Sequence, residues 1–562
     1  LYTFCVAAGM FLLWFSIFYA LATARVRKGM CFLILCFCGV FLADYLFFGR
    51  NLGNMSSLLI FDDEPSYTLF NRIGNLSLLC GIVLLLWLVW RYAAKMLHWV
   101  YIVAILSLLA MSVINVVKTS RVLSDTDYIR SDKIDVTSDK ILTLSRTGKN
   151  VVFIMLDRAI GYYGPYIFAE KPELKEIYDG FSLYPNTISF GAYTNFTTPS
   201  LFGGYEYSPT EINKRSSESL ASKQNEADLM LPVLFSENGF KTTVCDPPYV
   251  NYHYAGDLSI FDDYPEINAY NTRNPNAQPH QQAREEYRKQ VFFMYSVFKV
   301  APTLIQRQIY SGGDYRLFLD EDTDSFSMAA FMESYTVLDN MINMTLVEDS
   351  DRNTYFSMIN NLTHEPQVLQ LPDYEVAEEV HNDGLENKVR TDDKGNEFNL
   401  GNPKHYHTNM AAILLLGKWL DYLKENGVYD NTRIIIAADH GRARSHIDAL
   451  KIDDYNMMDV NPMFLFKDFD AHGFEISDEF MTNADAPTLA VGGIIDNPVN
   501  PFTGKAVNNE EKYAHKQLVT MSSNWDVLTN NGNVFDTSDA DWYSVHDDIF
   551  VKDNWEIWLK AE

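Results

Sequence analysis

Two stretches of the sequence place metal-binding side chains directly after mostly apolar runs. Asp157 follows residues 151–156, and Asp439 and His440 follow residues 433–438. Continuous apolar runs of this length are typical of strands buried on both faces of a parallel sheet. Because parallel strands end at the same edge of a sheet, we expect two carboxylates and an imidazole to converge there. Together they predict a zinc, manganese or magnesium site, although each motif alone also fits a helix cap or a turn.

A third apolar run, at residues 355–359, is followed by a histidine that we expect at the same edge of the sheet. It is followed by the segment Asn360-Asn-Leu-Thr-His364-Glu-Pro366. His364 is therefore expected near the predicted metal site, and a capping or purely structural histidine is the alternative.

A hydroxyl-rich stretch, residues 190–204, supplies candidate nucleophiles. Thr194 and Thr197 lie where a loop is expected to enter a helix, with Pro199 suited to the first helical turn. The N–H groups and the dipole at a helix N-terminus favour a bound phosphate. A threonine hydroxyl is a poor nucleophile at neutral pH, and a metal ion bound to it would stabilise the reactive alkoxide. The same residues also fit a turn that caps its own backbone.

The chain after residue 150 alternates strands and helices around these motifs. A helix at 231–238 ends at Gly239 and precedes a strand at 241–245, and a longer helix at 410–426 ends at Gly427. This alternation predicts an α/β layered sheet. The polar stretch 373–407 is expected to be a surface loop near the site or a solvated insertion. Four tryptophans beyond residue 496 are expected to cap the domain: Trp525, Trp542, Trp555 and Trp558.

Charge is unevenly distributed along the chain. Its 562 residues include 45 Lys and Arg against 73 Asp and Glu, a net charge of -28. Residues 1–120 hold only 8 of the basic and 4 of the acidic side chains. The hydrophobic content of 47% excludes a disordered chain. The acidic excess argues against a nucleic-acid partner, because phosphate backbones require clustered Lys and Arg.

Four apolar runs near the N-terminus are long enough to span a membrane: 1–24, 31–48, 73–90 and 97–117. Buried helices of a soluble protein rarely run this long without a charged face, and a signal peptide has a single, shorter apolar region. Asp44 lies near one end of its run, so we expect it at the solvated interface rather than in a proton relay.

Basic residues between the apolar runs predict the orientation of the chain. Arg25, Arg27 and Lys28 lie between the first two runs, and Arg91 and Lys95 lie between the last two. Because basic loops stay in the cytoplasm, residues 49–72 and everything after 117 are expected outside. The first run would then begin outside, so we expect one further helix upstream and five in all.

Taken in order, these motifs resemble the alkaline phosphatase/sulfatase superfamily. The resemblance rests on residues 150–157, the Gly/Thr/Pro-rich loop, Thr363-His364-Glu-Pro366, and residues 429–432 with 439–441. The chain is most similar to membrane-anchored phosphotransferases, the lipoteichoic acid synthases and lipid A phosphoethanolamine transferases, in which five membrane helices precede an outer catalytic domain. The resemblance implies an N-terminal transmembrane α-helical bundle followed by an α/β sulfatase-like domain with a mainly parallel central sheet.

The resemblance also implies roles for individual residues. Thr194 would be the nucleophile, since Gly191 and Pro199 frame it as in the transferases, while Thr197 fits the competing frame of nucleotide pyrophosphatases and sulfatases. Two histidines would contact the transferred phosphate, His364 and, with a less regular spacing, His446. One divalent ion, manganese, zinc or magnesium, would be held by four residues: Asp157, Thr194, Asp439 and His440.

Several departures from the family patterns narrow the assignment. Thr197 cannot be oxidised to the formylglycine of sulfatases, and Leu201 stands where their arginine belongs, so sulfatase activity is not expected. We find no counterpart of the extra Asp-x-x-x-His motif of two-metal pyrophosphatases among the predicted site motifs, so we expect one ion. Cys245 is the only cysteine of the outer domain, so it cannot form the disulfides of the phosphoethanolamine transferases. Asp157 replaces the glutamate that is usual in both transferase families.

The expected organisation is membrane helices at 1–117, a stalk at 118–149, a catalytic domain at 150–500 and a capping part at 501–562. The resemblance implies transfer of a phosphoglycerol or phosphoethanolamine head group from a phospholipid, through a threonine, to a glycan or lipid acceptor. A phosphodiester hydrolase and a catalytically silent lipid sensor are the alternatives. The protein would be a multi-pass protein of the cell membrane with an extracytoplasmic catalytic domain.

Overall fold

In the computed structural model the chain divides into two compact units, which we describe separately. The helical unit comprises Leu1–Tyr128 and Asn276–Ala329, and the sheet unit comprises Ile129–Pro275 and Ala330–Glu562. The structure describes residues 2–49, 52, 59, 61, 66–125, 132–252, 256–272, 280–311, 315, 325–377, 379–383, 385, 389–400, 403–442, 450–452, 455–522 and 532–561.

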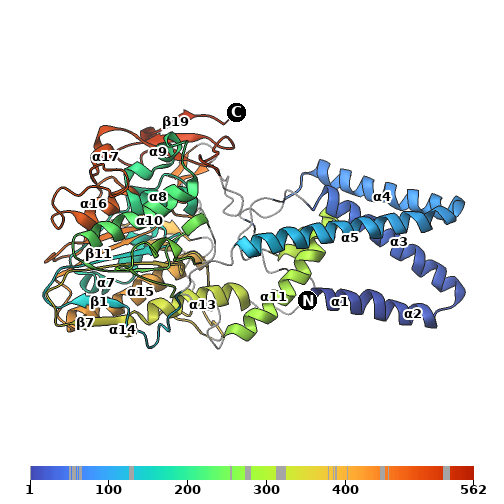
Figure 1. Cartoon of the computed structure of the whole chain (residues 1–562), viewed down its shortest axis with the longest axis horizontal. Coiled ribbons are helices and arrows are strands. Elements are labelled where there is room, and N and C mark those ends of the chain that lie inside the picture. Colours follow the sequence, from blue (N-terminus) through green and yellow to red (C-terminus); the bar gives the residue numbers. More distant parts are fainter. Residues whose placement is uncertain are drawn as a thin grey trace. The chain divides into compact units, whose positions relative to one another are not determined.

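The helical unit contains 3 helices, among the described residues, that are long and apolar enough to cross a membrane. They are α3 (Ala24–Phe47), α4 (Leu69–Tyr92) and most of α5 (Ala94–Asp125) (Figure 1). The first of the four predicted spans forms α1 (Tyr2–Ala8), a π-helical segment and α2 (Phe15–Leu21), and its apolar stretch is shorter, at Cys5–Leu21.

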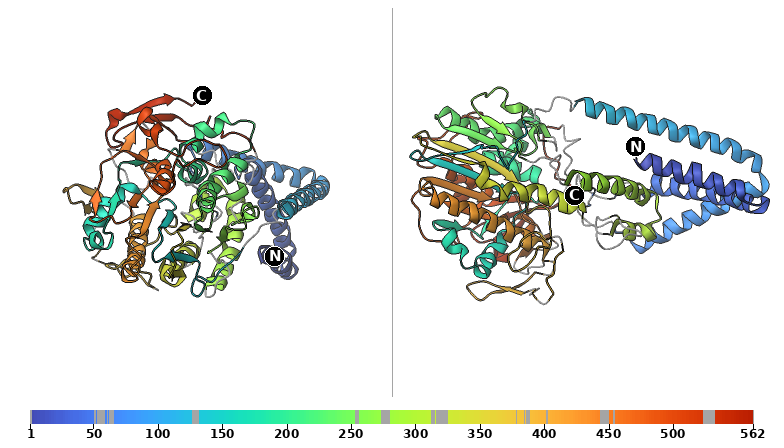
Figure 2. Two further views of the ribbon diagram at one scale, coloured as in Figure 1. Left: turned by 60° about the vertical axis from the view of Figure 1, so that its left-hand side comes forward. Right: turned by 90° about the horizontal axis from the view of Figure 1, so that it is seen from below.

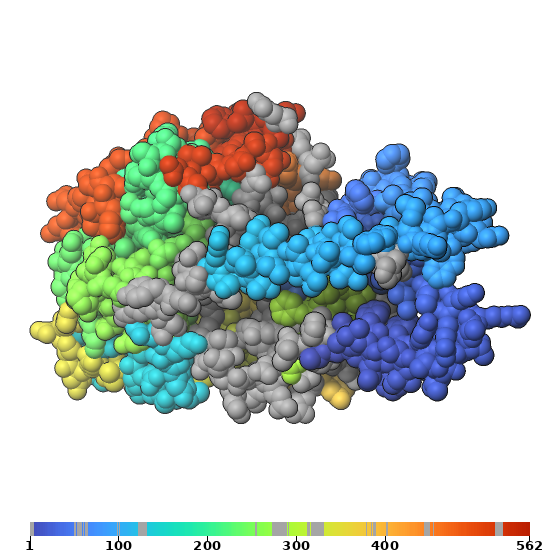
Figure 3. Space-filling model, turned by 45° about the vertical axis from the view of Figure 1, so that its right-hand side comes forward, coloured from blue at the N-terminus to red at the C-terminus, as the bar shows by residue number. Residues whose placement is uncertain are grey.

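The exposed surface of these helices is apolar. In Figure 3, α5 runs along the surface of the helical unit, and its side chains Val103, Leu109 and Val113 are largely exposed. A continuous apolar surface of this kind is suited to lipid rather than to water. The basic residues Arg25 and Arg27 lie in the first turn of α3 rather than in the loop that the sequence predicted.

The helical unit also includes a segment that the sequence pattern did not separate from the outer domain. In residues 276–329, α11 (His280–Val300) packs against α1 and α3, and α12 (Thr303–Tyr310) packs against α4. The chain thus leaves the sheet unit after Pro275 and returns to it at Ala330. The sequence pattern could not detect this segment, because the N-terminal half of α11 is polar and the segment therefore has no long apolar run.

An 8-stranded sheet forms the centre of the sheet unit, in the order β15-β3-β14-β11-β2-β8-β5-β6. Five neighbouring strands are parallel: β11 (Thr432–Ala437), β2 (Asn150–Leu156), β8 (Thr354–Asn360), β5 (Lys241–Cys245) and β6 (Asn268–Tyr270). At the other edge, β14 (Phe464–Lys467) is antiparallel to β11 and to β3 (Phe181–Leu183), which pairs in parallel with β15 (Glu475–Ile476). Every residue of β2, β8 and β11 is buried, as their continuous apolar runs predicted.

Helices cover both faces of this sheet. α10 (Leu220–Glu237) and α15 (Lys404–Glu425) lie on opposite sides of it, as Figures 1 and 2 show. Apolar side chains of α10 pack on the face presented by Val151, Phe153 and Met155. Two glycines follow the helices with positive φ, Gly239 at 82° and Gly427 at 65°, which confirms the predicted helix ends. The mainly parallel α/β architecture is therefore confirmed.

Parts of the polar stretches expected as stalk and loop are ordered into short elements. Within 118–149, α5 extends to Asp125 and β1 (Leu142–Ser145) pairs with β7 (Thr345–Glu348). Within 373–407 lies the hairpin of β9 (Val389–Thr391) and β10 (Glu397–Asn399), and α15 begins there, at Lys404. Strands this short produce no apolar run that the sequence pattern can detect.

A separate antiparallel sheet lies near the C-terminus. Its strands are β17 (Gln517–Thr520), β18 (Trp542–Val545) and β19 (Trp555–Leu559). The rings of Trp542 and Trp558 meet edge to face, with centroids 5.9 Å apart. Trp525, the first of the tryptophans predicted to cap the domain, lies outside the described residues.

Candidate metal centre

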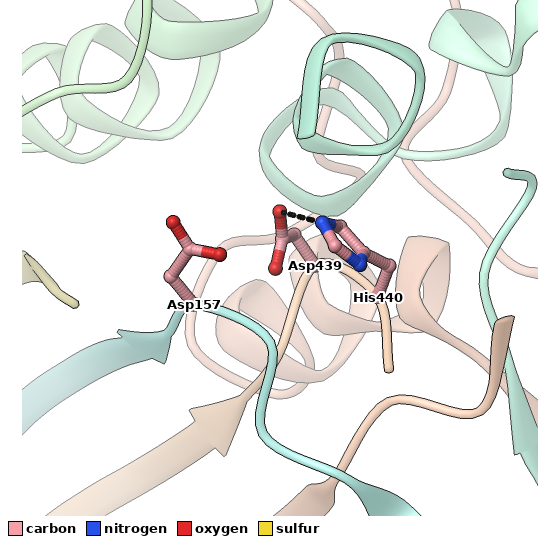
Figure 4. A group of neighbouring side chains, drawn as sticks. All are labelled: Asp157, Asp439 and His440. Atoms are coloured by element: carbon pink, nitrogen blue, oxygen red, sulfur yellow. Dashed lines mark ion pairs between the residues drawn. The ribbon is translucent and has the colours of Figure 1, made fainter. Parts of the chain in front are cut away.

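The register of the central sheet brings two aspartates to the same level. β11 and β2 are parallel neighbours, and Ala437 is paired with Met155. Asp439 and Asp157 lie two residues beyond this pair, so each follows the carboxyl end of its strand. His440 comes next in the chain, and the three side chains lie together beyond the two strand ends in Figure 4.

Asp157, Asp439 and His440 form a buried cluster whose potential ligand atoms all lie within 4.8 Å of one another. Burial raises the pKa of both carboxyl groups, and the charge of Asp439 raises that of Asp157 further. Oδ1 of Asp157 and Oδ2 of Asp439 have no hydrogen-bond donor within the described part of the chain. Buried acceptors without donors are costly, and a divalent cation between them would satisfy both. The cluster therefore fits a divalent metal ion.

The ring of His440 is oriented to offer a lone pair to this cluster. Its Nδ1 lies 2.7 Å from the carbonyl oxygen of Gly441, which only accepts hydrogen bonds, so Nδ1 carries the proton and Nε2 is free of one. Burial, followed by the charge of Arg158, lowers the pKa of His440 to about 3, so the ring is neutral. Gly441 is required at this turn because a Cβ atom would lie 2.0 Å from the carbonyl oxygen of Met458.

Thr194 is the first residue of α8 (Thr194–Gly203) and lies beside the cluster. Its Oγ1 is 3.3 Å from Nε2 of His440. The positive end of the helix dipole at this position favours a bound anion. Pro199, predicted in the first turn, lies inside the helix instead, because the helix begins at Thr194.

Thr197, the alternative nucleophile, uses its hydroxyl differently. The side chain is fully buried, and its Oγ1 donates a hydrogen bond to the carbonyl oxygen of Tyr193 at 3.0 Å. Thr198 makes a similar bond to the carbonyl oxygen of Thr194, at 2.8 Å. These hydroxyls satisfy the backbone of their own helix, whereas the hydroxyl of Thr194 faces the histidine.

His364 lies just beyond the end of β8, as predicted. Its Nδ1 is 3.0 Å from Oε1 of Glu365, and its side chain is partly exposed. Burial and Asp439 raise the pKa of Asp157, and the charge of His364 opposes them, so this ring is within electrostatic reach of the cluster. His446, the other histidine predicted to contact phosphate, lies outside the described residues.

Three residues to which the sequence analysis gave no role support the two aspartates. The backbone N–H of Arg158 donates to Oδ1 of Asp439 at 3.1 Å, and Thr363 donates its hydroxyl to the carbonyl oxygen of Asp157 at 2.6 Å. Asn483 donates Nδ2 to the carbonyl oxygen of Asp439 at 2.9 Å. Arg158 directly follows one predicted motif and Thr363 lies within another, and this position is the signal that could have found them. Asn483 is 44 residues from Asp439 and has no local signal.

Comparison with known proteins agrees with this fold. The family model described as Sulfatase matches residues 149–489, more than half of the chain. The chain therefore belongs to the sulfatase family, whose members are enzymes of the alkaline phosphatase superfamily. The resemblance stated from the motifs is confirmed at this level. No curated protein matches the chain.

Several solved structures are similar to the chain at low identity. The lipoteichoic acid synthase LtaP from Listeria monocytogenes is 13% identical, with a TM-score of 0.37, over 74% of this chain and 86% of its own. The C-terminal periplasmic domain of EcEptC from Escherichia coli is 12% identical, with a TM-score of 0.33, over 71% of this chain and 95% of its own. A 2-O GAG sulfatase, BT1596, is 13% identical, with a TM-score of 0.34, over 73% of this chain and 85% of its own.

Proposed function

We propose that the chain is a metal-dependent, membrane-bound phosphotransferase in which Thr194 is the nucleophile. The observation that carries this proposal is the position of the Thr194 hydroxyl, 3.3 Å from Nε2 of His440, at the edge of a cluster of carboxylate oxygens without donors. A hydroxyl at the start of a helix and beside a cation site is placed to attack a phosphorus atom.

Asp157, Asp439, His440 and Thr194 would hold one divalent ion, which would stabilise the Thr194 alkoxide and neutralise charge on the phosphate when bound. Thr194 Oγ1 forms the new bond to phosphorus as the bond from phosphorus to the diacylglycerol oxygen breaks. The proton lost by the Thr194 hydroxyl passes through water to that oxygen, so diacylglycerol leaves as an alcohol. An acceptor hydroxyl then displaces Thr194 from phosphorus, and the acceptor's proton restores the Thr194 hydroxyl. His364, and His446 if it also reaches the site, would bind the equatorial oxygens, where most of the charge lies.

The proposed donor is a phospholipid carrying a phosphoglycerol or phosphoethanolamine head group. Three helices of membrane-spanning length and composition support a lipid donor, because they confine the active site to the neighbourhood of a bilayer. The basic residues at one end of α3 support a location of the sheet unit outside the cytoplasm. The proposed acceptor is the hydroxyl group of an extracytoplasmic glycan or lipid.

Trapping of a phosphothreonine tests the nucleophile directly. Full-length protein in nanodiscs would be incubated with manganese and phosphatidylglycerol or phosphatidylethanolamine, and tryptic peptides would be analysed by mass spectrometry. The head-group phosphate is expected on Thr194 and absent from the Thr194→Ala variant, with diacylglycerol release lost. Thr197→Ala is the matched control on the same helix and is expected to keep both signals.

Three results would contradict the proposal. Undiminished diacylglycerol release by Thr194→Ala would exclude Thr194 as the nucleophile, and loss of the adduct in Thr197→Ala alone would move the role to Thr197. A labelled adduct that decays to free head-group phosphate in the presence of excess acceptor would make the protein a hydrolase rather than a transferase.

A further inference from the structure

The inserted segment of the helical unit forms a helical hairpin with its own aromatic core. α11 and α12 meet at Ala301 and Pro302, and Phe298, Tyr310 and Phe61 pack together between them and the loop before α4. The backbone N–H of Phe61 donates to the hydroxyl of Tyr310 at 2.8 Å. The hairpin is thus fixed to the end of the helical unit at which α3 finishes and α4 begins.

A buried polar network sets the depth of the hairpin against the membrane-spanning helices. Oδ1 of Asn75 accepts hydrogen bonds from the backbone N–H and the hydroxyl of Thr303, both at 3.2 Å, and its Nδ2 donates to Asp44 at 2.6 Å. Asn75 is the seventh residue of α4, about 9 Å along the helix axis from its first. Thr303, the first residue of α12, therefore lies at the level of the second turn of a membrane-spanning helix.

The sequence analysis expected Asp44 in solvent at the membrane interface. In the structure it is buried and takes part in this network instead. Its side chain is 0% exposed, and so is that of Asn75. The side chain of Asn75 is paired with Asp44 on one side and with Thr303 on the other, which explains why an amide is found at this depth. Oδ2 of Asp44 has no hydrogen-bond partner among the described residues.

The residues next to Thr303 are apolar and exposed. Leu304 is 48% exposed and Ile305 45%, while Gln306, Ile309 and Tyr310 on the opposite face are buried. Phe292, on α11, is 54% exposed, and it lies in the apolar stretch Val291–Val300. Polar side chains, Arg307 and Gln308, return one turn later along α12.

This apolar surface continues on the membrane-spanning helix beside it. At the same end of α4, Leu69 is 74% exposed, Phe70 84% and Ile73 56%. α12 packs against this helix, so the two sets of apolar side chains belong to one end of the unit. A surface of this composition at membrane depth is suited to acyl chains and the head-group boundary.

We infer that the corner between α11 and α12 inserts into the membrane leaflet at this end of the helical unit, with Phe292, Leu304 and Ile305 in contact with lipid. The partner is a lipid surface, not a second protein. The polar N-terminal half of α11 and the residues after Ile305 leave the leaflet on either side of this corner. The inference does not depend on the chemistry proposed for Thr194.

Photo-crosslinking in nanodiscs tests the lipid contact. p-Benzoyl-phenylalanine would replace Leu304 in one sample and Ile305 in another, in full-length protein in phosphatidylcholine/phosphatidylglycerol nanodiscs. Mass spectrometry is expected to find phospholipid adducts on the 300–311 region. The control places the same group at Gln308, one turn later on α12, where several-fold fewer lipid adducts are expected. A covalent dimer in place of lipid adducts, or equal adducts at all three positions, would overturn the inference.

Hydroxyl-radical footprinting provides a second measurement on the unaltered chain. Radicals form in water. Once oxidation is corrected for exposed area and for the intrinsic reactivities of Phe and Tyr, Phe292 (54% exposed) is expected to be oxidised several-fold less in nanodiscs than Tyr513 of the sheet unit (71% exposed). Equal oxidation of Phe292 and Tyr513 would show that the hairpin faces water, and the inference would fail.

Discussion

Two aspartates of the sheet unit are equally buried but have different surroundings. Asp485 is 0% exposed, and it accepts hydrogen bonds from the N–H of Thr482 at 2.9 Å and the hydroxyl of Tyr205 at 2.8 Å. Its Oδ2 also lies 3.3 Å from Nζ of Lys512, which is buried with it. Asp439 is likewise 0% exposed, but its Oδ2 has no donor among the residues described.

The contrast distinguishes a carboxylate whose partners lie within the chain from one whose position fits a metal ligand. Asp485 closes a capping box and neutralises a buried lysine, so its charge is compensated within the chain. Asp439 instead faces a second carboxylate, that of Asp157, and the unprotonated nitrogen of His440. Converging oxygen and nitrogen acceptors of this kind fit a cation from outside the chain.

The largest expected effect is on activity, in Asp439→Asn. The substitution removes a proposed metal ligand. It is expected to lower diacylglycerol release about 10⁴-fold or more, as is typical when one of several catalytic residues that act together is removed. Bound metal, measured by mass spectrometry of the purified protein, is expected to fall in parallel. Asp485→Asn is the matched control, and it should retain its metal in the folded fraction. Equal loss of bound metal in both variants would contradict the claim that Asp439, and not Asp485, is a metal ligand.

The next effect is on stability, in Asp485→Asn. This change removes one of the two carboxylates that Lys512 contacts and leaves Glu479 at 3.2 Å. The cost is therefore expected to lie below the roughly 3–5 kcal/mol of a buried pair that is broken completely. A lower midpoint of thermal unfolding, followed by tryptophan fluorescence in detergent, is the expected observation. The double variant Asp485→Asn with Lys512→Met is expected to recover part of the loss. Asp439→Asn in metal-free protein should not be destabilised, and a large destabilisation there would count against an open ligand site.

A smaller effect is expected from Gly441→Ala, which acts through His440. The added Cβ would collide with the carbonyl oxygen of Met458, so the turn that accepts the Nδ1 proton must shift. Loss of such an outer contact lowers metal affinity about 10–100-fold in other metal sites. Metal titration by isothermal calorimetry measures the change. Gly74→Ala, at a helical position with open space around it, is the control and should bind metal normally.

The smallest effect is the pH dependence of metal binding. Burial raises the pKa of Asp157 and Asp439 above the ordinary 3.8 in metal-free protein, so protons compete with the ion as the pH falls through the raised values. Affinity should weaken about tenfold per pH unit for each proton displaced and level off above those pKa values. The folded metal-free protein binds these protons more tightly than the unfolded chain does. Its free energy of unfolding should therefore fall as the pH rises from the ordinary carboxyl pKa to the raised values. A pH-independent affinity across it would contradict the raised pKa values.

The sequence was sufficient to predict the parts of the site that depend on the sheet. Residues 151–156 and 434–438 are apolar, as expected for strands covered on both faces, and this signal is local. The aspartates and His440 then follow from the rule that parallel strands end together. The burial of β2 and β11 and the convergence of Asp157 with Asp439 agree with these predictions.

The remaining features depend on contacts between distant segments, which the local pattern does not encode. The helix that begins at Thr194, rather than nearer Pro199, is set by packing, and its residues are all buried. The return of residues 276–329 to the helical unit depends on an aromatic core and on the bond between Asn75 and Thr303, 228 residues apart. Asn483 supports Asp439 from a separate segment of the chain for the same reason.

Anomalous diffraction from manganese-loaded crystals of the full-length protein tests the central claim most directly. One strong peak is expected in the sheet unit, about 2.0–2.3 Å from a carboxylate oxygen of Asp157, one of Asp439 and Nε2 of His440, with Thr194 Oγ1 as the fourth ligand. A peak away from these atoms, or none at them with manganese in excess, would contradict the account.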